Sequence, residues 1–316
     1  MTEPLWSGWQ PLSPRFTPPP PVLAETLDGG QAFRWRQTDG VWTGQWAGHL
    51  VQLRSAAGGL DWRSPPALQA AAAAALPRYL ALDHDWAALT DSLPWRSDPH
   101  LAQCLAAFPG LRLLRQPFGE TLLGFLCSAT KQIVQIKQMV ALLAARHGLP
   151  LLPLPAPRSR LPASFHRLPA WSELATIPES ELRACLLGFR AKYIHASAVF
   201  IAARPGWLEE TEHLPYPAAK ARLLELPGVG EKVADCVLLF GAGRLEAFPV
   251  DTWVLKSLAR RYGLVGWQPA QVAHFGRTHF GARAGLAQQY LFAWEREFGD
   301  RSLEGGTAGP ATGAAL

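Results

Sequence analysis

The chain has 316 residues, of which 48% are hydrophobic, enough to bury the core of one large domain or two ordinary ones. Its formal net charge of +5 permits a polyanionic partner without requiring one. No apolar run is long enough to cross a membrane, and the first residues lack the basic and apolar stretches of a secretory signal. The composition argues against a transmembrane helix, and we expect a cytoplasmic monomer with no membrane partner.

The first 21 residues are rich in proline and end in four consecutive prolines, which predicts an extended arm over 1–21. Between residues 22 and 64, apolar and polar residues alternate in short runs separated by glycine turns, which indicates an antiparallel meander of strands. The clearest runs are 31–36, 41–46 and 50–54. The alanine-rich stretch 67–75 predicts a helix. We assign 22–97 to a small N-terminal β-rich domain.

From residue 98 onward, apolar residues recur at three- and four-residue steps, which is typical of amphipathic helices. The proline-rich stretch 149–170 predicts a long connection, and the glycine-containing tail 301–316 is expected to be disordered. Helices are expected near 179–187, 190–203, 218–226, 231–240, 251–262 and 282–298. The predicted fold class is α+β, with a small antiparallel β-rich domain followed by a larger all-helical domain over 98–300.

The four cysteines are far apart in the chain, at Cys104, Cys127, Cys185 and Cys236. No pair has the C-x-x-C spacing of a zinc site, and the ligands of an iron–sulfur cluster usually lie closer together. Reduced and mostly buried thiols are therefore expected. We predict that the protein holds no structural metal.

The sequence LPGVG at 226–230 joins two of the predicted helices. Gly228 and Gly230 let the backbone turn sharply and expose its N–H groups on either side of Val229. These donors meet the positive end of the second helix dipole and form an anion site suited to a DNA phosphate. A glycine-containing turn between helices is common, but the full LPGVG matches the helix–hairpin–helix motif of DNA-binding proteins, here at 218–240.

Lys232 lies in the first turn of the second helix of this motif, where a cation opposes the helix dipole. The same positive field disfavours the ammonium form, and a neutral amine is what nucleophilic catalysis needs. A solvated surface lysine is the plain alternative. Asp251 follows an apolar, proline-containing run and precedes another predicted helix. We expect it to cap that helix and, as an ionised carboxylate, to stabilise an oxocarbenium-like sugar.

The segments LPGVGEKVADC at 226–236 and PVD at 249–251 resemble the helix–hairpin–helix glycosylase superfamily and, within it, the 8-oxoguanine DNA glycosylase family. Further blocks resemble this family in the same order, so the likeness extends over about 22–298. They are GQAFRW at 30–35, GLRLLRQ at 110–116, LLGFRAKY at 186–193 and AQQYLF at 287–292. The resemblance implies a base-excision repair N-glycosylase with AP lyase activity, whose partner is double-stranded DNA containing an oxidised purine.

The resemblance also implies roles for individual residues. Lys232 would attack the sugar C1′ of a flipped nucleotide and form a Schiff base that permits β-elimination, while Asp251 supports the charge on the sugar. Phe189 matches an aromatic residue that wedges beside the opposite base, and Arg190 matches one of two arginines that read an opposite cytosine. The chemistry needs only an amine, a carboxylate and a fitted pocket, so no cofactor is implied.

The pocket for the damaged base carries over in the same way. The carbonyl of Gly30 would accept a hydrogen bond from N7–H of 8-oxoguanine, whereas the lone pair at N7 of normal guanine would be repelled. Phe292 would stack on one face of the base, Cys236 would pack on the other, and Gln288 would meet the Watson–Crick edge. Taken singly, each of these residues fits an ordinary place in the core or on a helix surface equally well.

The chain departs from the family at several DNA-facing positions. Thr130, Lys131 and Gln132 stand where better-known members carry asparagines, one of which fills the gap left by the flipped base. Gln135 replaces the other arginine that reads the opposite cytosine, and Trp253 replaces a histidine expected to contact phosphate. We therefore predict that the chemistry is kept and that discrimination for an opposite cytosine is weaker than in members with both arginines.

Two alternatives remain open from the sequence. The first is an alkylpurine DNA glycosylase of the same superfamily without lyase activity, which would use an aspartate and a water, and the presence of Lys232 argues against it. The second is a non-catalytic DNA-binding module, in which the hairpin serves recruitment and Asp251 is incidental.

Overall fold

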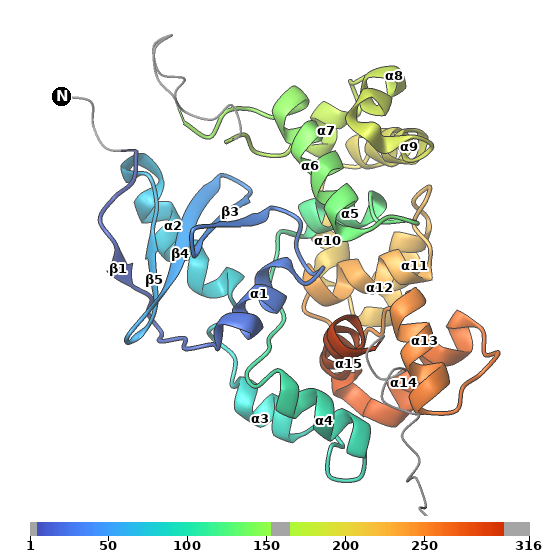
Figure 1. Cartoon of the computed structure of the whole chain (residues 1–316). Helices are drawn as coiled ribbons and strands as arrows, with labels where there is room; N and C mark the ends of the chain where they lie inside the picture. The colour runs from blue at the N-terminus through green and yellow to red at the C-terminus, as the bar shows by residue number, and fades with distance from the viewer. Residues whose placement is uncertain (1–4, 153–164, 300–316) are drawn as a thin grey trace, which may run out of the picture.

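The computed structural model describes residues 5–152 and 165–299 (Figure 1). A lobe of strands lies on one side of the molecule and a larger helical lobe on the other, and α1 (Pro20–Asp28) lies between the sheet and the helical lobe. The expected α+β class and the order of its two parts are confirmed. No helix within the described ranges combines the length and apolarity needed to span a bilayer.

The N-terminal lobe is built on one antiparallel sheet with the strand order β1-β5-β4-β3-β2. Large apolar side chains face inward at alternate positions, as in the aligned set Trp42, Leu53 and Trp62, and they pack against α2 (Pro66–Tyr79). The strands are β1 (Gln10–Pro11), β2 (Trp35–Thr38), β3 (Val41–Trp46), β4 (His49–Ala56) and β5 (Gly59–Arg63).

The helical lobe has its own core, in which α5 packs against α12 near the centre while α15 contacts α4 and α13. Its helices before the connection are α3 (Trp86–Asp91), α4 (Pro99–Ala107), α5 (Phe118–Leu126) and α6 (Ile133–His147). After it come α7 (Trp171–Leu174), α8 (Glu179–Leu182), a π-helical turn (Arg183–Leu187), α9 (Arg190–Ala202) and α10 (Trp207–His213). The last are α11 (Tyr216–Leu224), α12 (Glu231–Phe240), α13 (Thr252–Arg261), α14 (Pro269–Phe280) and α15 (Ala284–Phe298).

The N-terminal segment differs from the sequence prediction in two respects. The predicted arm over 1–21 does not stand apart from the fold, because β1 pairs with β5 and joins the sheet. It is also not extended to its end, because the last two prolines form the first turn of α1, where the N–H that proline lacks would have no partner within the helix. The predicted strand over 31–36 begins only at Trp35. The side chain of Gln31 is instead buried, donating to Arg112 O at 3.0 Å and accepting from Leu114 N at 2.9 Å.

The two hydrophobic cores do not divide at the predicted boundary between 22–97 and 98–300. Trp86 and Leu93 belong to the core of the helical lobe, as do Val22 and Phe33, whereas Leu114 packs into the core beneath the sheet. The chain therefore crosses between the lobes more than once, and the lobes share contacts. The predicted disordered tail, 301–316, and most of the proline-rich connection lie outside the described residues.

Candidate active site

The predicted hairpin joins α11 to α12, and α9 supports it from behind. Gly228 has φ +81°, and a Cβ atom there would lie 2.6 Å from Cβ of Tyr193, so only glycine fits. Ser197 Oγ donates to the carbonyl of Pro227 at 3.0 Å. Gly228 and Gly230 are exposed while the side chain of Val229 is buried, so the hairpin presents backbone to solvent. This is the geometry that a phosphate contact requires.

An ion network ties the two helices of the motif together, with Asp235 buried, Lys220 mostly buried and Glu231 exposed. Lys220 Nζ on α11 lies 2.9 Å from Asp235 Oδ1 and 2.5 Å from Glu231 Oε2 on α12. Tyr216 OH donates to the same Asp235 oxygen at 2.8 Å. Burial raises the pKa of Asp235 and the charge of Lys220 lowers it. Because one partner alone would be an uncompensated buried charge, this network fixes α12 and the side chains in its first turn. Sequence analysis did not identify it.

Lys232 projects from the first turn of α12 toward α5. Its Nζ atom donates to Ser128 Oγ at 3.1 Å and lies 5.0 Å from the ring centroid of Phe125. The Ser128 hydroxyl is buried and donates its own proton to the Phe125 carbonyl at 2.7 Å, so its lone pairs face the amine. Lys232 is thus held by a specific acceptor rather than left in solvent. No motif in the sequence marks Ser128, although it lies only two residues before Thr130.

Cys236 lies one turn after Lys232 on α12 and is buried. Burial raises the pKa of its thiol to about 12, while the charge of Lys232 lowers it and that of Asp251 raises it. The thiol is therefore neutral at physiological pH and acts as a small apolar wall. All four cysteines are buried and free of disulfide bonds, as the sequence predicted.

Asp251 occupies the predicted N-cap of α13, where Oδ1 accepts from Val254 N at 2.9 Å. The preceding apolar run anchors it, because Phe248 is fully buried and Val250 nearly so. Burial raises the pKa of the carboxyl group, and the Val254 N–H, the charge of Lys232 and the Trp253 N–H lower it. The expected ionised carboxylate therefore depends on these three interactions, since burial alone opposes it.

Two of the residues assigned to the base pocket, Gly30 and Phe292, lie next to each other although they are far apart in the sequence. Gly30 has φ +109°, and a Cβ atom there would lie 3.1 Å from Ile133 Cδ1 and 3.5 Å from Phe292 Cε1. The Phe292 side chain is only partly buried. Gln288, one turn before Phe292 on α15, is 4% exposed. Its Oε1 atom is buried without a hydrogen-bond partner in the described part of the chain, an arrangement that calls for an external donor.

The residues predicted to face the DNA fall into two groups. Thr130 and Lys131 are exposed and the Phe189 side chain is 52% exposed, so a duplex could reach them. Arg190, in contrast, is only 3% exposed. Its guanidinium donates to the carbonyls of Ala129 and Leu187 and, at 3.1 Å, to Thr130 Oγ1. In this structure Arg190 holds the 129–130 turn rather than projecting toward an opposite base.

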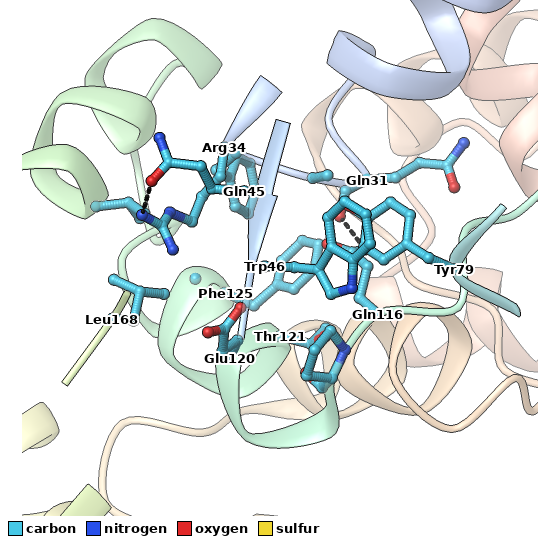
Figure 2. A pocket seen from close by; sticks show the side chains of 15 residues that line it. Gln31, Arg34, Gln45, Trp46, Tyr79, Gln116, Glu120, Thr121, Phe125 and Leu168 are labelled. Atoms are coloured by element: carbon cyan, nitrogen blue, oxygen red, sulfur yellow. Dashed lines mark hydrogen bonds between the residues drawn. The ribbon is translucent and has the colours of Figure 1, made fainter. Parts of the chain in front are cut away.

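A small cavity of about 30 Å³ lies where the sheet meets α5 (Figure 2). It is lined by Arg34 and Gln45, whose side chains bond at 3.1 Å, and by Glu120, which accepts from Ala47 N at 2.9 Å. Burial raises the pKa of Glu120, and the charge of Arg34 lowers it. None of the assigned catalytic or base-pocket residues lines this cavity. We interpret it as part of the joint between the lobes, and Phe125 connects it to the lysine.

Comparison with known proteins agrees with this geometry. A family model described as the N-terminal domain of 8-oxoguanine DNA glycosylase matches residues 17–122. The N-glycosylase/DNA lyase OGG1 of Arabidopsis thaliana is 32% identical over 307 residues, which cover 91% of this chain and 80% of the plant protein. A probable N-glycosylase/DNA lyase of Methanothermobacter thermautotrophicus is 36% identical over 128 residues, about 40% of each chain.

Solved structures resemble the whole architecture. The 8-oxoguanine glycosylase/lyase of Clostridium acetobutylicum, in a complex with double-stranded DNA containing cytosine opposite 8-oxoguanine, superposes with a TM-score of 0.78 at 29% identity. The match covers 88% of this chain and 92% of the bacterial one. The 3-methyladenine DNA glycosylase of Archaeoglobus fulgidus shares the fold at a TM-score of 0.70 but only 19% identity.

The sheet, the helical lobe and the hairpin define a helix–hairpin–helix glycosylase fold. Within that class, the chain belongs to the 8-oxoguanine DNA glycosylase family. The family resemblance seen in the sequence is thereby confirmed.

Proposed function

We propose that the protein is a base-excision repair N-glycosylase that removes 8-oxoguanine from duplex DNA and then cleaves the resulting site as an AP lyase. The observation that carries this proposal is the placement of Lys232. Its amine is held by the buried hydroxyl of Ser128 at the positive end of α12, within electrostatic range of Asp251. Family membership points to the same activity, since its relatives include an N-glycosylase/DNA lyase and an 8-oxoguanine glycosylase/lyase.

In the proposed reaction, the lone pair of the Lys232 amine nitrogen attacks C1′ of the flipped nucleotide. The bond between C1′ and N9 breaks, its electron pair leaves with the base, and the base takes up a proton. Asp251 stabilises the positive charge that develops on the sugar while this bond breaks. The nitrogen then gives up one proton to solvent and the bond between C1′ and O4′ breaks. O4′ keeps the electron pair and takes up a proton, which leaves a protonated Schiff base at C1′. Loss of a proton from C2′ then expels the 3′ phosphate by β-elimination.

Recognition of the base is proposed to rest on hydrogen-bond complementarity. The Gly30 carbonyl accepts from N7–H of 8-oxoguanine, a proton that guanine lacks. The Oε1 atom of Gln288, which is buried and has no hydrogen-bond partner among the described residues, accepts a hydrogen bond from a donor on the Watson–Crick edge. The base thereby supplies the partner that the protein does not. Phe292 and Cys236 enclose the two faces of the ring. A pocket that leaves polar atoms unpaired with the wrong base discriminates more strongly than an apolar one.

The DNA is proposed to be held by the hairpin backbone at Gly228 to Gly230 and by Thr130, Lys131 and Phe189. Discrimination for an opposite cytosine is proposed to be weak, because Gln135 replaces an arginine and Arg190 is engaged in bonds to the protein. Excision rates against the four opposite bases within about tenfold of one another are expected. Strict dependence on cytosine would contradict this part of the proposal. Because the substrate is chromosomal DNA, we expect the protein at the nucleoid, as a cytoplasmic monomer.

The direct test is incubation with a duplex that carries one 8-oxoguanine opposite cytosine. Strand cleavage should occur without alkali through the lyase step and increase after alkali, which cleaves abasic sites that remain. A duplex with one alkylated purine provides the comparison with the alkylpurine alternative. Cleavage of the alkylated duplex alone would favour that alternative, and cleavage of neither would favour a non-catalytic DNA-binding module.

A further inference from the structure

The guanidinium of Arg296, on α15, contacts both walls of the proposed base pocket. Its Nη1 atom donates to the Gly29 carbonyl at 2.6 Å, in the turn that leads to Gly30. The same nitrogen lies 3.1 and 3.2 Å from the carboxylate oxygens of Glu25 on α1. Its Cζ atom is 5.6 Å from the ring centroid of Phe292, one turn earlier on α15.

The Gly29–Gly30 turn needs such restraint from outside. Two consecutive glycines impose little conformational preference of their own, and Gly30 adopts φ +109°. The bond from Arg296 to the Gly29 carbonyl fixes the plane of the peptide that links Gly29 to Gly30. Ile133 of α6 also lies against Gly30, and Lys137 of α6 pairs with Asp28 at 2.6 Å. The turn is thus held between α6 and α15.

The charges around Glu25 make Arg296 difficult to replace at this position. Burial raises the pKa of Glu25, Arg296 lowers it, and the nearby carboxylates of Glu297 and Asp28 raise it, with a net pKa of about 7. Lys137 pairs with Asp28. Loss of Arg296 would leave Glu25 among other carboxylates without its cation. A neutral side chain at 296 would therefore remove the bond to the Gly29 carbonyl and leave the buried Glu25 without its cation.

We propose that Arg296 is a positioning residue for the damaged base. It sets the distance between the Gly30 carbonyl, which accepts from N7–H, and the Phe292 ring, which stacks on the base. The inference rests on the proposed function and assigns to it a residue outside the pocket lining. A purely structural role is the alternative, since a cation that bonds a carbonyl at the C-terminus of α1 also caps that helix. The two roles differ in which substrates they affect.

The test compares a substrate that fills the pocket with one that leaves it empty. Single-turnover cleavage is measured for Arg296→Met and Arg296→Lys on a duplex with 8-oxoguanine and on the same duplex with a preformed abasic site. A base misplaced by about 1 Å loses up to about 100-fold in rate. We expect Arg296→Met to lose roughly 30-fold on 8-oxoguanine and less than about twofold on the abasic site. Arg296→Lys, which keeps the charge and one donor, should recover part of the loss.

Arg260→Met is the matched control, because Arg260 pairs with Glu295 on the same helix at 2.9 Å and is assigned no role in the pocket. It should change cleavage of the two substrates in equal proportion. An equal loss on both substrates for Arg296→Met would overturn the positioning role while leaving the proposed function intact. Failure of the unaltered protein to cleave either substrate would instead overturn the proposed function.

Discussion

Lys232 Nζ and Ser128 Oγ lie 3.1 Å apart, in a hydrogen bond that links the first turn of α12 to the end of α5. The serine hydroxyl is itself oriented by the Phe125 carbonyl, so the acceptor faces the amine before any DNA binds. The lysine side chain is long and flexible, so this hydrogen bond orients the amine in advance. Less conformational entropy is then lost on the way to the transition state, and the barrier is lower.

Replacement of Ser128 by alanine should slow excision without unfolding the protein. A hydrogen bond to a charged group contributes about 1.5–3 kcal/mol, and only the part of it that is gained in the transition state changes the rate. The rate should therefore fall by up to roughly 10- to 100-fold. Single-turnover rates on the 8-oxoguanine duplex measure the effect.

Ser64→Ala is the matched control for this variant. Ser64 is also buried and also donates to a backbone carbonyl, that of Leu50 at 2.8 Å, but it lies in the sheet lobe and has no assigned role in the site. Excision by Ser64→Ala should stay close to the unaltered rate. An unchanged rate in Ser128→Ala would show that the lysine needs no such acceptor.

Asp251→Asn separates the capping role of this residue from its charge. Asparagine is as good an N-cap as aspartate, so the midpoint of urea unfolding should change by little. Excision should fall on the order of 100-fold, because the charge that supports the sugar is lost. In the unaltered protein, burial raises the pKa of Asp251. As the pH is lowered, the carboxylate should therefore take up a proton, and activity should fall, at a higher pH than an ordinary aspartate would give. Full activity in the asparagine variant would exclude the electrostatic role.

Gly228→Ala should damage the hairpin far more than Gly230→Ala. A Cβ atom at Gly228 would lie 2.6 Å from the Tyr193 side chain at φ +81°, whereas nothing lies within 4 Å at Gly230. The strain predicts a loss of about 1–3 kcal/mol in the free energy of unfolding at the first position, and little change at the second. Urea denaturation measures both variants, and duplex binding should weaken in Gly228→Ala. Equal stability of the two variants would contradict this account of the turn.

Glu25 should make stability depend on pH in a direction opposite to most carboxylates. Its pKa rises from 4.5 to about 7, so the folded state binds the proton more tightly. This contribution to folding is complete below about pH 4.5 and is lost as the pH rises through 7. Relative to Glu25→Gln, the protein should therefore lose stability on the order of 2 kcal/mol between pH 5 and 8. A difference that stays constant with pH would contradict the raised value.

The sequence predicted the fold class, the hairpin and the capping role of Asp251, because glycine spacing and helix-terminal residues act locally. It did not predict α1, whose prolines favour an extended chain until the first helical turn accepts them. It also missed Ser128 and the network around Lys220, since neither forms a motif and both depend on contacts between helices. The buried position of Arg190 follows from the turn at 129–130, which no local pattern reveals.

The measurement that tests the central claim most directly is borohydride trapping on a duplex containing 8-oxoguanine. Reduction should convert the Schiff base into a stable bond between the protein and DNA, and Lys232→Gln should abolish both the trapped complex and base release. Binding of the duplex to the variant should persist, because the hairpin that contacts phosphate is unchanged. A trapped complex in Lys232→Gln, or excision at the unaltered rate, would show that Lys232 is not the nucleophile.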